Sequence, residues 1–318
     1  SIPPHNLHEV INGVIALIKK PTLSDEDLIK IIPGPDFPTG GEVLLGSGIK
    51  ETYLKGKGSI PMRGLAHIEE VQPGKGKHKR SAIIITELPY QLSKAGWIEK
   101  LAELVNDGKI NGVADIRDES DRDGMRIVVE LRRDNDPEKT LKELQRKTSL
   151  QNNFGATLLA LVDGQPKQLS LKHLLEKFIE YRELTLIKRT RFLLKKTLDR
   201  LEIVDGLIKG LKNLRATIQM IETAKDAHEA KTKLISKLNI TDTQAEAILA
   251  MPLRRLTSLE QESLHKEVKD LTLTKIELEL LIQNRDKLLN TLIKELKEIK
   301  KQFGNKRRTK LIEGGDQL

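Results

Sequence analysis

The stretch LHKEVKDLTLTKIELELLIQNRDKLLNTLIKELKEIKKQF, residues 264–303, decides the fold because its apolar residues repeat with a heptad period. Of its twelve a and d positions, only Lys275 and Arg285 are polar. A repeat of this regularity over five heptads predicts a long coiled-coil helix. The apolar seam positions are Leu264, Val268, Leu271, Leu278, Ile282, Leu289, Leu292, Leu296, Ile299 and Phe303.

A second long helix is predicted upstream. Residues 172–224 contain no proline and only two glycines, both late in the run. The seam positions there are Leu184, Ile187, Leu194, Leu198, Leu201 and Ile208. Shorter helical pieces follow over residues 226–258, where Pro252 forces a break. Two long helices joined in this way must fold back as an antiparallel pair, with the short helices as a knob at the turn.

The N-terminal part has a mixed pattern. Asn6 is a predicted N-cap for a helix over residues 5–20. The short apolar runs SAIIITEL (81–88) and MRIVVELR (125–132) are typical of strands. Residues 158–169, with Asp-Gly at their centre, indicate a hairpin.

The sequence therefore predicts an α+β body followed by an all-α part, with long antiparallel coiled-coil arms that carry a helical knob. The predicted segments are residues 1–170 for the body, 171–205 for the first arm, 206–258 for the knob, 259–304 for the second arm and 305–318 for a basic tail or linker.

Composition limits the function classes. The 318 residues include no cysteine, which excludes thiolate zinc sites and cysteine nucleophiles and is compatible with a cytoplasmic location. No stretch approaches the roughly 18 apolar residues of a membrane span. The net charge of +9 indicates a polyanionic partner. Basic residues concentrate at 294–310 and at 75–80, and charge runs of this kind are most often a solvated surface or tail. If one of them contacts phosphates, we expect the contacts at Lys77, Lys79 and Arg80.

An acidic segment offers the strongest candidate for a metal site. Residues 119–124 (ESDRDG) and Glu130 have the spacing of a calcium-binding loop. However, Arg126 stands where such a loop has an apolar residue, and a strand follows where a helix is required. We expect a tight acidic turn, with calcium binding as the minor alternative. The histidines are scattered and no phosphate-loop motif is present, so we expect neither a metal site nor an ATP site.

Ile2 precedes Pro3-Pro4 and a capped helix, so its side chain is held stiffly. Apolar side chains presented in this way can insert between base pairs and kink duplex DNA. From these residues alone, packing of Ile2 on its own helix is the commoner outcome.

Five segments carry a resemblance to a known family. They are SIPPHNLHEVINGVIALI (1–18), IIPGPDFPTGG (31–41), RDESDRDGMRIVVEL (117–131), TQAEAILAMPLRRLTSLE (243–260) and QFGNKRRTKL (302–311). With these segments the chain strongly resembles the family formed by the A subunit of bacterial DNA gyrase and its close relative, the C subunit of topoisomerase IV.

The resemblance implies part of a type IIA topoisomerase, in which one DNA duplex passes through a transient break in another. The body would be the DNA-supporting tower domain, with Ile2 as the side chain that intercalates into the gate DNA. The knob would be an exit gate that pairs with a second copy. We expect its dimer contacts at Ile248, Leu249, Met251 and Leu253. ATP and the cleavage Mg²⁺ would be bound by a partner B subunit, in an A2B2 complex, and this chain would bind no cofactor.

One departure from the family pattern concerns catalysis. The family's nucleophilic tyrosine follows an arginine on a winged-helix domain upstream of the IPPHN motif, and none of Tyr53, Tyr90 and Tyr181 stands in that motif. We therefore expect no catalytic residue here and no DNA cleavage by this part alone. The QFGNKRRTKL segment favours gyrase over topoisomerase IV. Periodicity leaves open a different class, a non-enzymatic DNA-associated coiled-coil scaffold.

Overall fold

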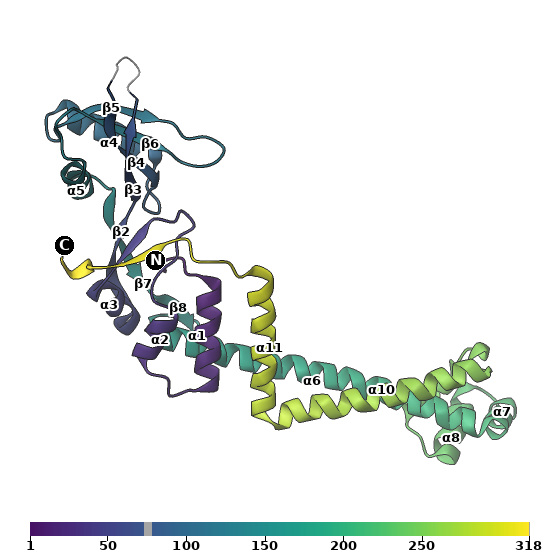
Figure 1. The fold of residues 1–318 in the computed structure, drawn as a ribbon. Coiled ribbons are helices and arrows are strands. Elements are labelled where there is room, and N and C mark those ends of the chain that lie inside the picture. The colour runs from purple at the N-terminus through teal and green to yellow at the C-terminus, as the bar shows by residue number, and fades with distance from the viewer. Residues whose placement is uncertain (73–77, 318) are drawn as a thin grey trace. The chain divides into compact units, whose positions relative to one another are not determined.

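A computed structural model describes residues 1–72 and 78–317. They form two compact units (Figure 1). The first comprises Ser1–Glu180 together with Ile293–Leu318, and the second comprises Tyr181–Leu292. The first unit is α+β and the second is helical, as the sequence predicts.

The first unit contains two four-stranded sheets, of order β10-β1-β2-β7 (sheet A) and β3-β4-β6-β5 (sheet B). Neighbouring strands are antiparallel except β1 and β10, which pair in parallel. The strands are β1 Glu42–Leu45, β2 Lys57–Arg63, β3 Leu65–Val71, β4 Arg80–Glu87, β5 Val113–Asp118, β6 Ile127–Leu131, β7 Gln151–Thr157 and β10 Lys310–Glu313. The predicted strands over 81–88 and 125–132 are confirmed as β4 and β6.

Local sequence signals fix several of the unit's helices. The side chain of Asn6 accepts a hydrogen bond from the Glu9 N–H, which confirms the predicted N-cap of α1. The predicted hairpin is confirmed as β8 (Leu159–Val162) and β9 (Gln165–Gln168). Its turn residues, Asp163 and Gly164, both have positive φ, as a tight two-residue hairpin requires. The helices are α1 Leu7–Lys19, α2 Asp25–Ile31, α3 Ser47–Lys55, α4 Lys94–Asn106 and α5 Pro137–Lys147.

The main core of the first unit lies between sheet B and the helices α4 and α5. Trp97 and Leu101 of α4 are buried in one cluster with Ile83 and Ile85 of β4. The Trp97 indole N–H donates to the Thr148 hydroxyl over 3.1 Å, so its one polar group is satisfied inside the core. Each fully buried side chain of this size contributes about 1.5–3 kcal/mol.

The predicted basic tail over 305–318 is wrong, because this segment is part of the body. Its strand β10 lies at the edge of sheet A, where Val43 pairs with Leu311. The Arg307 guanidinium is only 18% exposed. It donates to both carboxylate oxygens of Glu9 and to the carbonyl oxygens of Gly34 and Pro35. A charge expected in solvent therefore joins the two ends of the described chain.

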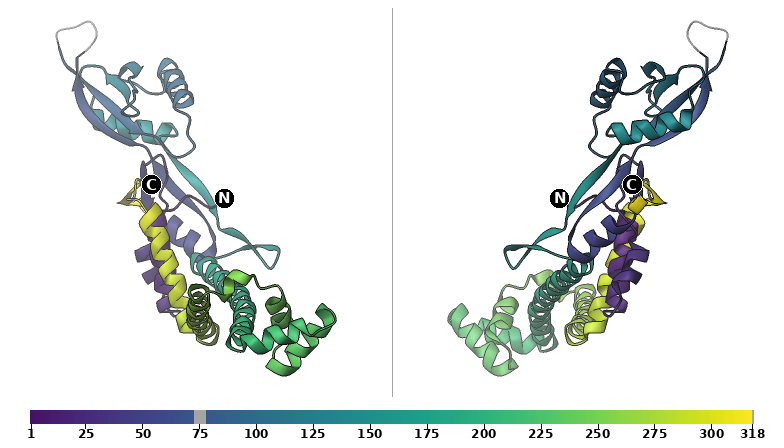
Figure 2. Two further views of the ribbon diagram at one scale, coloured as in Figure 1. Left: turned by 90° about the vertical axis from the view of Figure 1, so that its right-hand side faces the viewer. Right: turned by 90° about the vertical axis from the view of Figure 1, so that its left-hand side faces the viewer.

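The C-terminal part of helix α11 (Arg285–Phe303) also packs on the body. Figures 1 and 2 show this part of the helix beside α1. The Lys300 ammonium donates to the Asn12 side-chain oxygen over 3.0 Å. Residues 293–303 are thereby fixed against the N-terminal helix.

The second unit consists of antiparallel arms and a group of short helices. Arg200 binds Glu267 through two hydrogen bonds of 2.6 and 3.1 Å, and Arg285 binds Glu183 through two of 2.6 and 3.2 Å. As the residue number rises along one arm it falls along the other, which confirms the antiparallel pairing. The helices are α6 Leu171–Lys212, α7 Leu214–Glu222, α8 Ala227–Leu238, α9 Asp242–Leu249, the 3-10 helix η1 Leu253–Leu256, α10 Ser258–Gln283 and α11 Arg285–Phe303.

The second arm is not the single helix that the heptads predict. It ends at Gln283 and restarts at Arg285. Between them, the Asn284 side-chain oxygen accepts from the N–H groups of Asp286 and Lys287, which caps α11. The break coincides with the polar seam position Arg285, whose side chain pairs with Glu183 instead of packing in a seam.

The seam predicted for the first arm is also partly wrong. Leu184 and Leu198 are 60% and 38% exposed. Between residues 190 and 211 of α6, a row of buried residues falls instead on other positions, seven residues apart. These positions are Thr190, Thr197, Val204 and Leu211. Two of them are threonines, whose hydroxyls donate to carbonyls one turn back in the helix, so a count of apolar residues misses them.

Among the described residues, no helix combines the length and apolar character needed to cross a membrane.

We predict that Arg307→Ala lowers the free energy of unfolding of the first unit by about 2 kcal/mol, because it leaves the half-buried Glu9 carboxylate and two carbonyls without their donor. The fluorescence of Trp97, the one tryptophan, would report urea unfolding of this unit. Arg308→Ala is the matched control, since Arg308 is exposed and its side chain reaches only the Pro38 carbonyl, at 3.3 Å. Equal losses in both variants would contradict the prediction.

Candidate nucleic-acid interface

Ile2 is an exposed apolar side chain on an anchored segment. Its side chain is 44% exposed, whereas the neighbouring Pro3 is buried. The Thr157 N–H at the end of β7 donates to the Ser1 carbonyl over 3.0 Å, and the Asp36 N–H donates to the Pro4 carbonyl over 2.9 Å. The backbone is therefore held on both sides of Ile2, while its side chain stays exposed rather than buried on the helix that follows.

Two rings support this segment through hydrogen bonds, the half-buried His5 and the buried Tyr53. His5 Nδ1 lies 2.7 Å from the Pro3 carbonyl oxygen. Because a carbonyl only accepts, Nδ1 carries the proton, and Nε2 accepts from the Tyr53 hydroxyl, also at 2.7 Å. Burial lowers the pKa of His5 and raises that of Tyr53, so both stay neutral near pH 7.

Sequence reasoning missed this pair. Tyr53 lies 48 residues from His5, on the buried face of α3. No spacing or motif indicates that a tyrosine on one helix reaches the histidine that follows Pro3-Pro4. In the sequence, Ile49 and Tyr53 stand four residues apart, which indicates that Tyr53 lies on the buried face of α3 but does not identify its partner.

Asp36 fixes the start of α1 next to this segment. Its carboxylate accepts from the Asn6 amide over 2.9 Å and from the N–H groups of Arg308 and Thr309. Burial alone would raise the pKa of Asp36, but these hydrogen bonds outweigh it, so the pKa lies below its ordinary value. The IPPHN segment is thus tied to the strand that returns from the C-terminal end.

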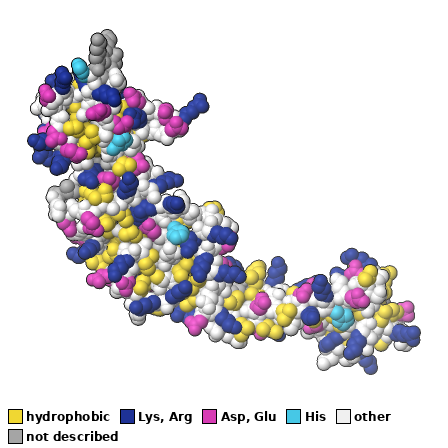
Figure 3. All heavy atoms as spheres, viewed as in Figure 1, with side chains coloured by type: hydrophobic (Ala, Val, Ile, Leu, Met, Phe, Trp, Pro, Cys, Tyr) yellow, Lys and Arg dark blue, Asp and Glu magenta, His cyan; other side chains and the backbone are white. Residues whose placement is uncertain are grey.

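The predicted phosphate contacts are placed only in part. Lys77 lies outside the described residues. Lys79 is exposed and makes no ion pair with any described residue, which leaves its charge available. Arg80 is 43% exposed, but it pairs with the buried Glu130 over 3.2 Å, so its charge is partly compensated. On the face in Figure 3, basic side chains alternate with acidic and apolar ones rather than gathering in one large patch.

The acidic segment forms the predicted turn between β5 and β6, closed by a bridge between Asp121 and Gly124. Two of its four calcium-loop carboxylates pair with arginines. Glu119 pairs with Arg117 and Arg126 at 3.3 Å each, and Glu130 pairs with Arg117 and Arg80. Among the described residues, no group of three or more acidic or histidine side chains is arranged to hold a metal ion.

The four residues predicted for the dimer contact have different environments. Ile248 is only 3% exposed and packs in the core of the second unit, against Gly210 of α6. Its side chain is not available to a partner, so that assignment is wrong. Leu249 and Met251 are partly buried against the same cluster. Leu253 is 83% exposed and fits an intermolecular contact best.

Comparison with known proteins agrees with these features. The family of the A subunit of DNA gyrase/topoisomerase IV matches residues 1–297. The A subunit of DNA topoisomerase 4 from Synechocystis sp. is 51% identical over 99% of this chain and 34% of its own length. The A subunit of DNA gyrase from the same organism is 48% identical over 100% of this chain and 37% of its own length. The A subunit of DNA gyrase from Halalkalibacterium halodurans is 43% identical over 99% of this chain and 37% of its own length.

The chain therefore belongs to the family of A subunits of type II DNA topoisomerases, DNA gyrase and topoisomerase IV. It spans about a third of the length of these relatives. Both kinds of subunit match at similar identity, 51% and 48%, so the identities define the family rather than one of its two branches.

We predict that Tyr53→Phe destabilises the first unit by about 1–3 kcal/mol, because the buried His5 Nε2 then has no donor. Thermal unfolding followed by Trp97 fluorescence would measure the loss. Tyr181→Phe makes the same chemical change at a side chain that is 66% exposed, and it should change stability by less than about 0.5 kcal/mol. Similar small changes in both variants would show that the His5–Tyr53 bond contributes little.

Proposed function

We propose that this chain is the DNA-bending and exit-gate part of the A subunit of a type II topoisomerase. In the parent enzyme, one duplex passes through a transient double-strand break in another, driven by ATP hydrolysis in a B subunit that also binds the cleavage Mg²⁺. We expect this part alone not to cleave DNA, because none of its three tyrosines stands in the family's nucleophile motif. Tyr53 is buried and Tyr90 stacks on Phe37, whereas Tyr181 is 66% exposed.

The observation that carries the proposal is the presentation of Ile2. Unstacking one base step costs a few kcal/mol, so a wedge must be held rigidly to keep the step open. Two backbone hydrogen bonds and the His5–Tyr53 pair hold the chain on either side of Ile2. A flexible apolar side chain would instead avoid the step and pack on protein.

The exit gate is proposed from the second unit. An enzyme that cuts both strands of a duplex needs a contact between its two halves that does not depend on the DNA. Leu253, with partial contributions from Leu249 and Met251, provides an apolar surface for a two-fold contact with a second copy.

Within the family we propose gyrase activity, which introduces negative supercoils, on the strength of the QFGNKRRTKL segment. Topoisomerase IV activity, which relaxes and decatenates DNA, is the second candidate, favoured by the 51% identity to a topoisomerase 4 protein. The two activities differ in their product.

The test uses the full-length parent with its B subunit, ATP and Mg²⁺ on relaxed plasmid and on linked DNA circles. Negative supercoiling identifies gyrase activity, whereas decatenation without supercoiling identifies topoisomerase IV activity. Ile2→Ala should reduce the bend of a doubly labelled gate duplex and slow strand passage about tenfold or more, since a few kcal/mol of unstacking are no longer offset.

Ile2→Leu is the control, because it keeps a branched apolar wedge of the same size. The bend and the rate should both survive in this variant. If the parent is active and Ile2→Ala bends DNA as the unsubstituted protein does, Ile2 is not the wedge. If the parent shows no topological activity, the non-enzymatic scaffold becomes the favoured function.

The dimer contact has its own test. Leu253→Asp should convert this chain from dimer to monomer in sedimentation experiments at micromolar concentration, because a carboxylate would be desolvated at the interface. Leu161→Asp is the matched control, since Leu161 is also a leucine at 75% exposure but lies in the hairpin of the first unit. A dimer that persists with Leu253→Asp would contradict the proposed gate contact.

A further inference from the structure

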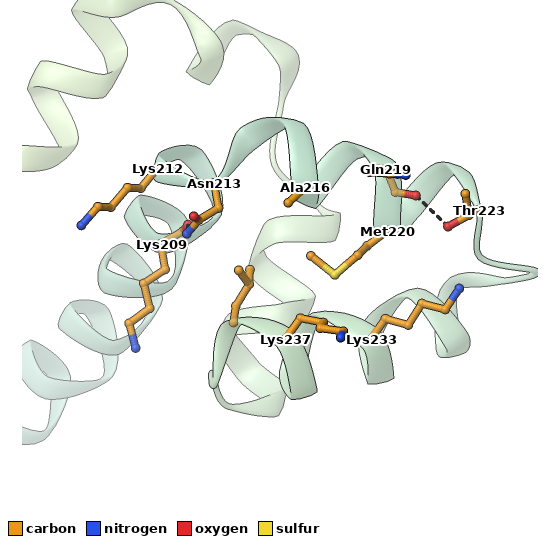
Figure 4. Close-up of a pocket in the computed structure, with 10 residues that line it drawn as sticks. Lys209, Lys212, Asn213, Ala216, Gln219, Met220, Thr223, Lys233 and Lys237 are labelled. Carbon is orange, nitrogen blue, oxygen red and sulfur yellow. Dashed lines mark hydrogen bonds between the residues drawn. The ribbon is translucent and has the colours of Figure 1, made fainter.

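A basic cavity lies within the second unit, and Leu253 is not among the residues that line it. It has a volume of about 820 Å³ and is formed by the end of α6 together with α7 and α8 (Figure 4). Four lysines, Lys209, Lys212, Lys233 and Lys237, line what we call the lysine pocket. No acidic side chain is among its lining residues.

The charges of the pocket are largely uncompensated. Lys233 pairs with Glu229 over 3.3 Å, whereas Lys209, Lys212 and Lys237 make no ion pair with any described residue. Lys231 on the same helix α8 is different, because it pairs with Asp242 at 2.9 Å and Glu246 at 3.2 Å. The fold thus neutralises the α8 lysine outside the pocket and leaves most cations around the pocket free.

The remaining lining suits an anion that has polar oxygens. The side chains of Asn213 and Gln219 supply amide donors beside the lysines. Met220 points into the space between α7 and α8 and gives the pocket an apolar wall (Figure 4). Lysine ammoniums bind phosphate as compact point charges, and several of them around one hollow repel each other until an anion enters.

We propose that the lysine pocket binds phosphate groups, in the first instance those of a DNA backbone. Residues 206–258 carry nine Lys or Arg against five Asp or Glu, so the field around the pocket also attracts a polyanion. Neither Ile2 nor Leu253 lines the pocket, so phosphate binding there does not depend on the proposed function. A nucleotide or free pyrophosphate has the same chemistry and is the other source of such a ligand.

The methionines allow a local test. The sequence has four, of which Met220 lines the pocket while Met251 belongs to the same unit but does not line it. In the chain labelled with ¹³C-methyl methionine, a short blunt-ended duplex should shift the Met220 resonance in a saturable way and leave that of Met251 in place. Parallel titrations with ATP and with pyrophosphate identify the source of the phosphate.

Charge removal provides the second arm of the test. The triple variant Lys209→Gln, Lys212→Gln, Lys237→Gln should weaken the ligand affinity seen at Met220 at least tenfold. It should also reduce the salt slope of that affinity by up to about 0.9 for each lysine–phosphate pair that the substitutions remove. Lys231→Gln is the matched control and should leave both unchanged, because that charge is already paired.

Each outcome decides the proposal. A Met220 shift with duplex that is absent in the triple variant supports a DNA site, and a shift with ATP or pyrophosphate alone supports a site for free phosphates. A Met220 resonance that none of the three ligands moves would overturn the proposal. So would a shift that persists in the triple variant, or one that Met251 shares. Circular dichroism of the variants verifies that the helices are intact.

Discussion

The contact between Arg307 and Glu9 is the constraint on which the rest of the first unit depends. It joins the segment before β10 to the first helix, and the same guanidinium holds the turn at Gly34 and Pro35. The helical unit is thereby an insertion whose two ends both return to one α+β body. A half-buried guanidinium needs several acceptors, and another arrangement of these segments would leave some of its N–H groups without one. The contact therefore specifies how the segment before β10 docks on the first helix.

The wedge depends on this closure. Asp36 receives hydrogen bonds from the returning strand and donates its own N–H to Pro4. The neutral His5–Tyr53 pair then fixes the carbonyl of Pro3. The exposed Ile2 follows from these buried polar contacts, each of which would cost free energy if left unmade. The proposed wedge thus draws its rigidity from polar contacts within its own unit.

The sequence predicted the secondary structure correctly wherever a few neighbouring residues determine it. The Asn6 cap, the Asp-Gly hairpin and the apolar runs of β4 and β6 were all readable, and so was the antiparallel order of the arms. The heptad pattern of apolar residues gave a wrong prediction where polar residues end a helix or occupy its buried positions. Asn284 restarts the helix by capping it, and Thr190 and Thr197 occupy buried positions because their hydroxyls bond within the helix. Ile248 is apolar, as a residue of a dimer contact would be, but it is buried in the core of its own unit.

The sequence by itself determined the class of each part, the α+β body, the paired arms and the family, because periodicity, caps and long motifs are local properties of the chain. Only the tertiary structure decided which charges are available. Arg307 pairs with the half-buried Glu9 and Arg80 with the buried Glu130, whereas most lysines around one pocket have no ion-pair partner among the described residues. The reason is physical: a charge is compensated by whichever group the fold brings within about 4 Å, and that neighbour is usually distant in the sequence.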